Sequence, residues 1–220
     1  MPKAIIEKYK SFEKWKSQEV YTEFGLKRNF DNPIFLTDFL SVEPHVTEVE
    51  RAIIQRLQAR LLRMAEAWNE FDMSIAFIGQ LLDIIDFHQQ EYRTFFNHSL
   101  KTVFKGKEIT GRVDCMLARG WQIPENPIFF LQEYKSESGP NGDPLGQLLV
   151  EMLVAQDLNK DPNAPIYGCY IVGRNWFFVI LLEKEYAVSD AYVATQSDIY
   201  DIVAILKKVK RLFEEKINQI

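Results

Sequence analysis

Two apolar segments of this chain are interrupted by charged residues. The segment IFFLQEYKSE, residues 128–137, begins like a buried strand and then carries Glu133 and Lys135, while the segment GRVDCMLA carries Asp114 between apolar residues. Burying an ionised group costs several kcal/mol unless the group is paired or binds a cation. These charges therefore indicate either structural ion pairs or a chemical site.

The alternation of a β-strand would bring these charged groups together. Glu133 and Lys135 share one face of their strand and lie roughly 7 Å apart along it. In the preceding strand, Asp114 lies on the same face as Arg112 and Met116. Sequential strands are usually neighbours in a sheet, so we expect Asp114 and Glu133 to converge.

The residue types favour metal-assisted hydrolysis of a phosphodiester. Two carboxylates provide the hard oxygen ligands that Mg²⁺ or Mn²⁺ prefers, and such an ion takes further oxygens from water and phosphate. A lysine beside the ion can orient or deprotonate an attacking water and stabilise negative charge in the transition state. The backbone carbonyl of Tyr134, between Glu133 and Lys135, is a further candidate ligand.

Helical periodicity dominates the first part of the chain. Apolar residues at Ile5, Tyr9 and Phe12 predict one helix, and the apolar stripe from Val46 to Met64 predicts another. We interpret residues 1–68 as a helical accessory region outside the core.

The remaining chain predicts an α/β domain over residues 69–195 and a C-terminal helix over 196–220 that packs on it. Asn69 is suited to cap a helix that reaches about residue 86. From about residue 92 to 189, runs of β-branched and aromatic residues predict strands. One helix, LGQLLVEMLVAQDLN, interrupts these strands after the turn-forming segment SGPNGDP. We therefore expect helix, three strands, helix and two strands in a hairpin.

Asp114 followed by FFLQEYK resembles the D…(D/E)xK signature of the PD-(D/E)XK nuclease superfamily, the restriction-endonuclease-like fold. The likeness covers about residues 69–182, and the wider run also resembles uncharacterised bacterial proteins assigned to that superfamily. It implies an αβββαβ core with a central mixed sheet, flanked by helices. The chain departs from the family pattern because Val113, rather than proline, precedes Asp114.

The same resemblance implies roles for five residues. Asp114 and Glu133 would hold Mg²⁺ or Mn²⁺, and Lys135 would lie near the nucleophilic water. Gln147 in the following helix and Glu70 in the first helix occupy positions that join the site in several branches of the superfamily.

Three of the polar residues can also be explained by an ordinary structural or surface role. Gln147 suits a site and an ordinary polar surface equally, whereas for Glu151, four residues later on the same helix face, the surface is favoured. Glu70 could simply complement the dipole of its helix.

Charge and composition limit the function classes. A net charge of −5 gives no general attraction to nucleic acid, so phosphates would be held by metal or by a local basic patch. The candidates for such phosphate contacts surround the strand that carries Asp114: Lys101, Lys105, Lys107 and Arg112. The basic stretch KKVKRLFEEK is better explained as a solvated helix face.

We therefore expect a Mg²⁺-dependent nuclease acting on DNA, with RNA as the second choice. The alternative is a non-catalytic module of the same fold that binds nucleic acid or a protein partner. The sequence is also compatible with a homodimer. No apolar run is long enough to cross a membrane and the first residues lack a signal peptide's pattern, so we expect a cytoplasmic protein.

Overall fold

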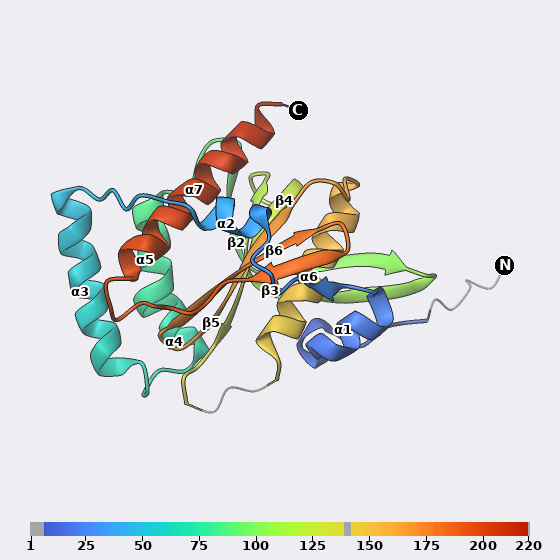
Figure 1. Cartoon of the computed structure of the whole chain (residues 1–220), viewed down its shortest axis with the longest axis horizontal. Helices are drawn as coiled ribbons and strands as arrows, with labels where there is room; N and C mark the ends of the chain where they lie inside the picture. The colour runs from blue at the N-terminus through green and yellow to red at the C-terminus, as the bar shows by residue number, and fades with distance from the viewer. Residues whose placement is uncertain (1–6, 139–141, 220) are drawn as a thin grey trace.

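A computed structural model of the chain, which describes residues 7–138 and 142–219, is an α/β protein (Figure 1). A mixed central sheet carries helices on both faces. The strands are β1 (Lys27–Arg28), β2 (Tyr92–Phe104), β3 (Lys107–Arg119), β4 (Glu125–Lys135), β5 (Ile166–Val172), β6 (Asn175–Leu182), β7 (Glu185–Val188) and β8 (Tyr192–Val193). The helices are α1 (Ser17–Phe24), α2 (Ile34–Leu40), α3 (Glu48–Met64), α4 (Glu70–Met73), α5 (Gly79–Ile85), α6 (Pro144–Asn159) and α7 (Ile199–Ile217), with a 3₁₀ turn η1 (Phe12–Lys14) and a π-helical turn η2 (Ser74–Ile78).

Within the described residues the sheet has eight strands in the order β1-β7-β6-β5-β4-β3-β2, and β8 pairs with β6. The β4–β5 and β1–β7 pairs are parallel, and the other pairs are antiparallel. A parallel pair of consecutive strands needs a crossover connection, which α6 provides between β4 and β5. The sheet therefore places the two strands of interest, β3 and β4, side by side.

The predicted order of elements after Asn69 is confirmed. Asn69 caps α4, and its side chain accepts a hydrogen bond from the Asp72 N–H at 2.8 Å. Three strands, α6, and the β5–β6 hairpin follow, with Val172 paired to Asn175 across the turn. The expected mixed sheet, flanking helices and N- and C-terminal helices are all present.

The first predicted helix is wrong over the residues that the structure describes, and Ile5 lies outside them. Around Tyr9 the chain is extended, and the Tyr9 N–H donates to the carbonyl of Glu108 at 2.8 Å. Phe12 begins only a 3₁₀ turn and packs so closely over Gly111 that a Cβ there would lie 2.2 Å from the Phe12 ring. Tertiary contacts with β3 thus outweigh the local helical periodicity.

The apolar stripe of α3 is also displaced from the predicted one. Ile54, Leu57 and Leu61 are fully buried, whereas Val49 is 71% exposed and Met64 40% exposed. At the N-terminal end of α3 the fully buried residue is thus Ile54, while Ile53 of the predicted stripe is partly buried against the same cluster.

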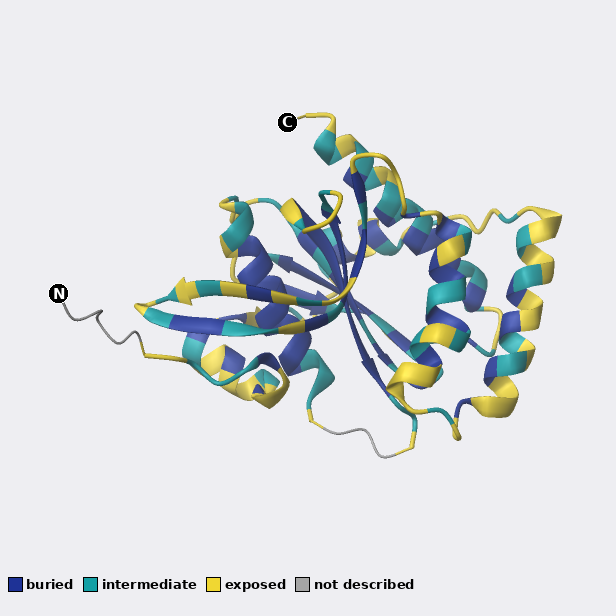
Figure 2. Cartoon of the chain, turned by 180° about the vertical axis from the view of Figure 1, so that it is seen from behind, coloured by how far each residue is buried: buried dark blue, intermediate teal, exposed yellow. Residues whose placement is uncertain are grey.

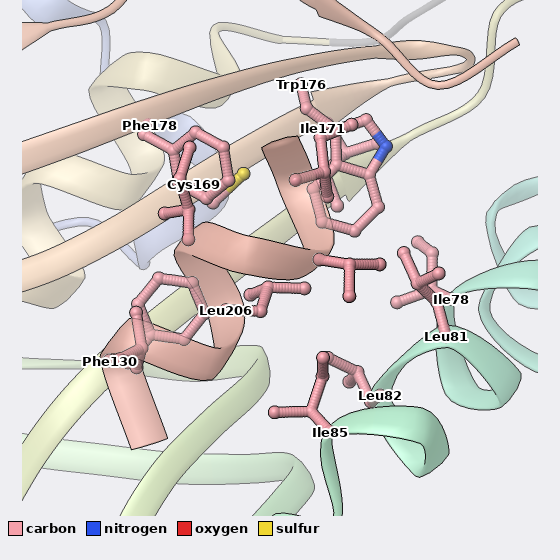
Figure 3. Packing of buried hydrophobic residues seen from close by; sticks show 14 of the residues in the cluster. Ile78, Leu81, Leu82, Ile85, Phe130, Cys169, Ile171, Trp176, Phe178 and Leu206 are labelled. Carbon is pink, nitrogen blue, oxygen red and sulfur yellow. The ribbon is translucent and has the colours of Figure 1, made fainter. Parts of the chain in front are cut away.

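Two hydrophobic clusters lie on opposite faces of the sheet. Figure 1 shows α3, α4, α5 and α7 on one side and α1 and α6 on the other. In Figure 3, sheet residues converge on α7 and α5; those labelled from the sheet are Phe130, Cys169, Ile171, Trp176 and Phe178. This face forms a continuous apolar core, as expected for a chain of this length.

Helix α6 is buried on all sides rather than on one face (Figure 2). Its inner side packs on the sheet, and its outer side is covered by η1 and α1. The Ser17 N–H and hydroxyl each donate to the carboxylate of Asp143, the N-cap residue of α6, at 2.8 Å. The N-terminal segment is therefore part of the packing around α6, which explains why α6 is apolar all round.

The docking of this segment predicts the sign of a mutational effect at Gly146. A Cβ at this position would lie 2.5 Å from the Ser17 nitrogen and 2.7 Å from the Trp15 carbonyl oxygen. We expect Gly146→Ala to lower the free energy of unfolding by about 1 to 3 kcal/mol because of overpacking. Urea denaturation measures this change. Stabilisation by up to about 1 kcal/mol, the usual gain of alanine over glycine inside a helix, would show that the segment is not docked.

Candidate active site

The charged residues lie at the point where strands β3 and β4 stop pairing. The two strands pair from Arg119–Glu125 to Cys115–Gln132, and the same offset puts Asp114 opposite Glu133. Beyond this point β3 continues into a long hairpin with β2, while β4 continues alongside β5 as far as Lys135. The carboxylates are thus held on rigid strands at the edge of an opening.

Glu133 is fully buried and is held by two donors. One of its oxygens accepts a hydrogen bond from the ammonium group of Lys135, and the other accepts from the Gln147 amide nitrogen at 2.7 Å. The alternation of β4 turns both Glu133 and Lys135 toward α6, on which Gln147 lies. A strand residue and a helix residue are therefore joined inside the core.

Gln147 also connects Glu133 to a third carboxylate. Its amide nitrogen lies 3.2 Å from Oε1 of Glu151, one helical turn further along α6. Glu151 is fully buried, and its Oε2 has no hydrogen-bond partner among the described residues. The surface interpretation of Glu151 is wrong because Gln147 and Glu151 lie on the side of α6 that faces β4, where Gln147 donates to Glu133.

Asp114 is half-buried and faces the opening. Its Oδ2 accepts a hydrogen bond from the Tyr134 N–H at 2.8 Å. The N–H and C=O of one strand residue point to the same side, so the carbonyl of Tyr134 also points toward β3. The predicted metal ligands, Asp114, Glu133 and this carbonyl, consequently come from adjoining positions.

Lys135 connects this cluster to the first helix of the core. Its ammonium nitrogen lies 3.7 Å from a carboxylate oxygen of Glu70, whose side chain is 48% exposed. Glu70 lies in the first turn of α4, so it can complement the helix dipole and contact Lys135 at once. The structure thus brings together Asp114, Glu133, Lys135, Gln147 and Glu70.

Burial raises the pKa of the carboxyl groups in this cluster. Burial first, and then the charge of Asp114, raise the pKa of Glu133 to about 9, although Lys135 opposes the shift. Burial also raises the pKa of Asp114, against the opposing hydrogen bond from Tyr134, and raises that of Glu151, with Glu133 adding to the effect. Burial alone would lower the pKa of Lys135, but contact with Glu133 raises it. One lysine is too little positive charge for these buried carboxylates.

The structure does not bring the predicted phosphate-binding lysines to this cluster. Lys105 and Lys107 lie at the turn of the β2–β3 hairpin, and a rise of about 3.3 Å per residue puts Lys107 roughly 20 Å from Asp114. The three lysines pair with acidic residues: Lys101 with Glu108 at 2.6 Å, Lys105 with Glu23 at 3.8 Å and Lys107 with Glu7 at 3.2 Å.

Arg112 is nearer to the cluster than these lysines. It is exposed on β3, two residues from Asp114, and donates to the side-chain oxygen of Asn97 at 3.2 Å. Arg112 therefore stays a candidate for contact with a phosphate.

Comparison with known proteins adds no family name, because no protein-family model matches the chain and no curated protein matches it. None of the helices in the described part of the chain is long and apolar enough to span a membrane. The chemistry must therefore be judged from the arrangement of the side chains.

The donor set fits a hard divalent cation. Across residues 7–138 and 142–219, no group of three or more His, Cys, Asp or Glu side chains is arranged to hold a metal ion. The available protein ligands are two carboxylates and one main-chain carbonyl, which is the small set that Mg²⁺ accepts when water and substrate complete its shell. The excess of buried carboxylates and the unpartnered oxygen of Glu151 fit an added positive charge.

The buried acids predict an unusual pH dependence of stability. A carboxyl whose folded-state pKa is raised stabilises the fold below its ordinary value, about 4.5, and loses that contribution as pH rises toward the folded value of about 9 for Glu133. We expect the melting temperature of the metal-free protein to fall between these limits. Glu151→Gln should reduce the fall and raise the free energy of unfolding at pH 8 by about 1 to 3 kcal/mol, because glutamine has no proton to release on unfolding, whereas burial raises the pKa of Glu151.

Thermal scans from pH 5 to pH 9 compare the two proteins. At pH 5 they should melt nearly alike, since this pH is close to the ordinary pKa of a glutamate, where the raised pKa of Glu151 has cost little stability. A Glu151→Gln protein that is much less stable at pH 8 would mean that Glu151 is an ionised partner of a cation.

Proposed function

We propose that this chain is a Mg²⁺-dependent nuclease of the PD-(D/E)XK superfamily that hydrolyses phosphodiester bonds of DNA, with RNA as the second choice of substrate. The observation that carries the proposal is the set of carboxylates near one lysine where β3 and β4 part, of which Glu133 and Glu151 are fully buried and Asp114 is half-buried. Burying such a set costs stability, and proteins retain costly buried charge most often at functional sites. The order of elements after Asn69 supports the superfamily assignment.

Each residue has a role that its contacts support. Asp114, Glu133 and the Tyr134 carbonyl would hold Mg²⁺ or Mn²⁺, and the bound ion would supply Lewis-acid stabilisation of the phosphate and a more acidic water. Lys135, which is 8% exposed, can hold a water by hydrogen bonding and stabilise developing negative charge.

Two further residues act through these groups. Gln147 fixes the orientation of the Glu133 carboxylate by its 2.7 Å hydrogen bond. Glu70 lies 3.7 Å from the Lys135 nitrogen, and its charge favours the protonated lysine. Both are positioning residues in this proposal.

The alternative, a non-catalytic module, would use the same residues as structural partners. In that case Glu133 and Lys135 form an ion pair that needs no metal, and Asp114 merely accepts the Tyr134 N–H. Activity and metal binding separate the two functions.

The first test is cleavage. In Mg²⁺ or Mn²⁺ the protein should cut single-stranded or double-stranded DNA, and Lys135→Met should lower the rate by about 10² to 10⁴-fold, since it removes a group that acts in the transition state. Methionine keeps most of the apolar stem of the lysine, and circular dichroism checks that the variant is folded. Gel assays with labelled DNA measure the rate.

The same substitution at exposed Lys14 is the matched control and should leave cleavage unchanged. Equal cleavage by the Lys135→Met protein would point to a contaminating nuclease. A wild-type protein that cuts neither DNA nor RNA would favour the non-catalytic module.

The second test is metal-induced stabilisation, which needs no substrate. Mn²⁺ that binds only the folded state should raise the melting temperature with concentration, by about 2.7 kcal/mol at one hundred times its Kd. Asp114→Asn removes a ligand charge while its amide oxygen can still accept the Tyr134 N–H. Without metal it should melt no lower than wild type, and it should lose most of the Mn²⁺ shift.

Asp83→Asn is the matched control, because Asp83 is exposed near Asp114 but has no contact with the buried cluster. It should keep the full Mn²⁺ shift. A loss of about 3 to 5 kcal/mol in Asp114→Asn, with no metal response in wild type, would instead identify Asp114 as a structural counter-charge.

A further inference from the structure

An open groove of about 700 Å³ adjoins the candidate active site. Asp114, Tyr134 and Glu70 line it, so it is continuous with the buried carboxylate cluster. Its other walls come from α4, η2 and α5 on one side and from β2 on the other. A substrate that reaches Asp114 must therefore lie partly in this groove.

Large apolar side chains are exposed on both walls of the groove. Phe71 on α4 is 71% exposed, Ile75 on η2 is 59% exposed, and Phe96 on β2 is 43% exposed. Exposed apolar groups gathered in one concave place usually mark a binding surface. The π-helical turn that carries Ile75 is itself a feature found often at functional sites.

The polar groups of the groove do not suit phosphates. Among its described lining residues there is no lysine or arginine, whereas Glu70, Asp83 and Asp114 are acidic. Gln80 and Asn97 add side-chain amides. The Gln80 nitrogen donates to the Ala76 carbonyl and the Asn97 oxygen accepts from Arg112, so the Gln80 oxygen and the Asn97 nitrogen can bond to uncharged groups of a ligand. The groove thus fits a flat, uncharged group with an apolar face and polar edges.

We propose that this groove binds an unpaired base of DNA next to the phosphate that is cleaved, with the base stacked on Phe71 or Phe96. The inference rests on the proposed nuclease function and names its substrate: single-stranded or locally unpaired DNA. In a duplex the faces of each base are covered by its neighbours, so only an unstacked base can lie against an aromatic ring. The volume is also that of a site for a small molecule, which one or two nucleotides resemble in size.

Binding of matched oligonucleotides tests the proposal. The probes are fluorescent DNA of one length as a single strand, as a duplex, and as a single strand made of abasic sites, which keeps the phosphates and removes the bases. Fluorescence anisotropy in Mg²⁺, with the Lys135→Met protein to keep the DNA intact, should show the single strand binding on the order of tenfold more tightly than either other probe.

Variants then locate the base. Phe71→Ala or Phe96→Ala should weaken single-strand binding on the order of tenfold and leave abasic binding unchanged. Trp121→Ala is the matched control, because Trp121 is 77% exposed but lies outside the groove, and it should change neither. These side chains are exposed, so the substitutions should not unfold the protein.

The outcomes separate this inference from the proposed function. Equal binding of the normal and abasic strands, binding of neither, or phenylalanine variants that bind like the parent would overturn the base-binding groove, even if the wild-type protein cuts DNA. A preference for bases that depends on Phe71 or Phe96, in a protein that cuts no DNA, would support the groove and reject the nuclease.

Discussion

The burial of the Glu133 carboxylate against a single lysine, Lys135, is the constraint on which the rest of this structure depends. Glu133 can be buried because Lys135 and Gln147 both donate to it, and Gln147 can do so because α6 crosses directly over β4. That crossing requires the parallel β4–β5 pair, and the burial of α6 requires the covering segment around Trp15. The polar cluster is therefore a result of the whole topology rather than of one loop.

Local periodicity predicted the parts of this protein that short-range forces decide. The alternation along β4 put Glu133 and Lys135 on one face, and the turn before Asn175 defined a hairpin that the structure contains. The order of elements and the mixed sheet followed from such patterns. The use of Asp114 and Glu133 as metal ligands stays a prediction.

Contacts between distant parts of the chain were beyond the sequence pattern. Glu151 lies four residues after Gln147, as a surface residue would, but the crossing of α6 over β4 turns this helix face toward Glu133 inside the core. The lysines around β3 were close to Asp114 in sequence, but an extended hairpin carries Lys107 away from it. A single signal could have revealed Glu151: α6 is apolar around its whole circumference, which indicates burial on both sides.

The covering of α6 by the N-terminal segment also has a consequence for the order of folding during synthesis. Ser17 and Asp143, which bond to each other, are 126 residues apart in the chain. At about 5 to 20 residues per second, a ribosome makes the docking surface roughly 6 to 25 seconds after the segment that covers it. Throughout that interval Trp15, Val20 and Phe24 lack their native contacts with α6, although Trp15 and Phe24 can already pack on each other and Phe24 can pack on Phe104. The synthesis of α6 therefore decides when this earlier segment becomes fully protected from misassembly.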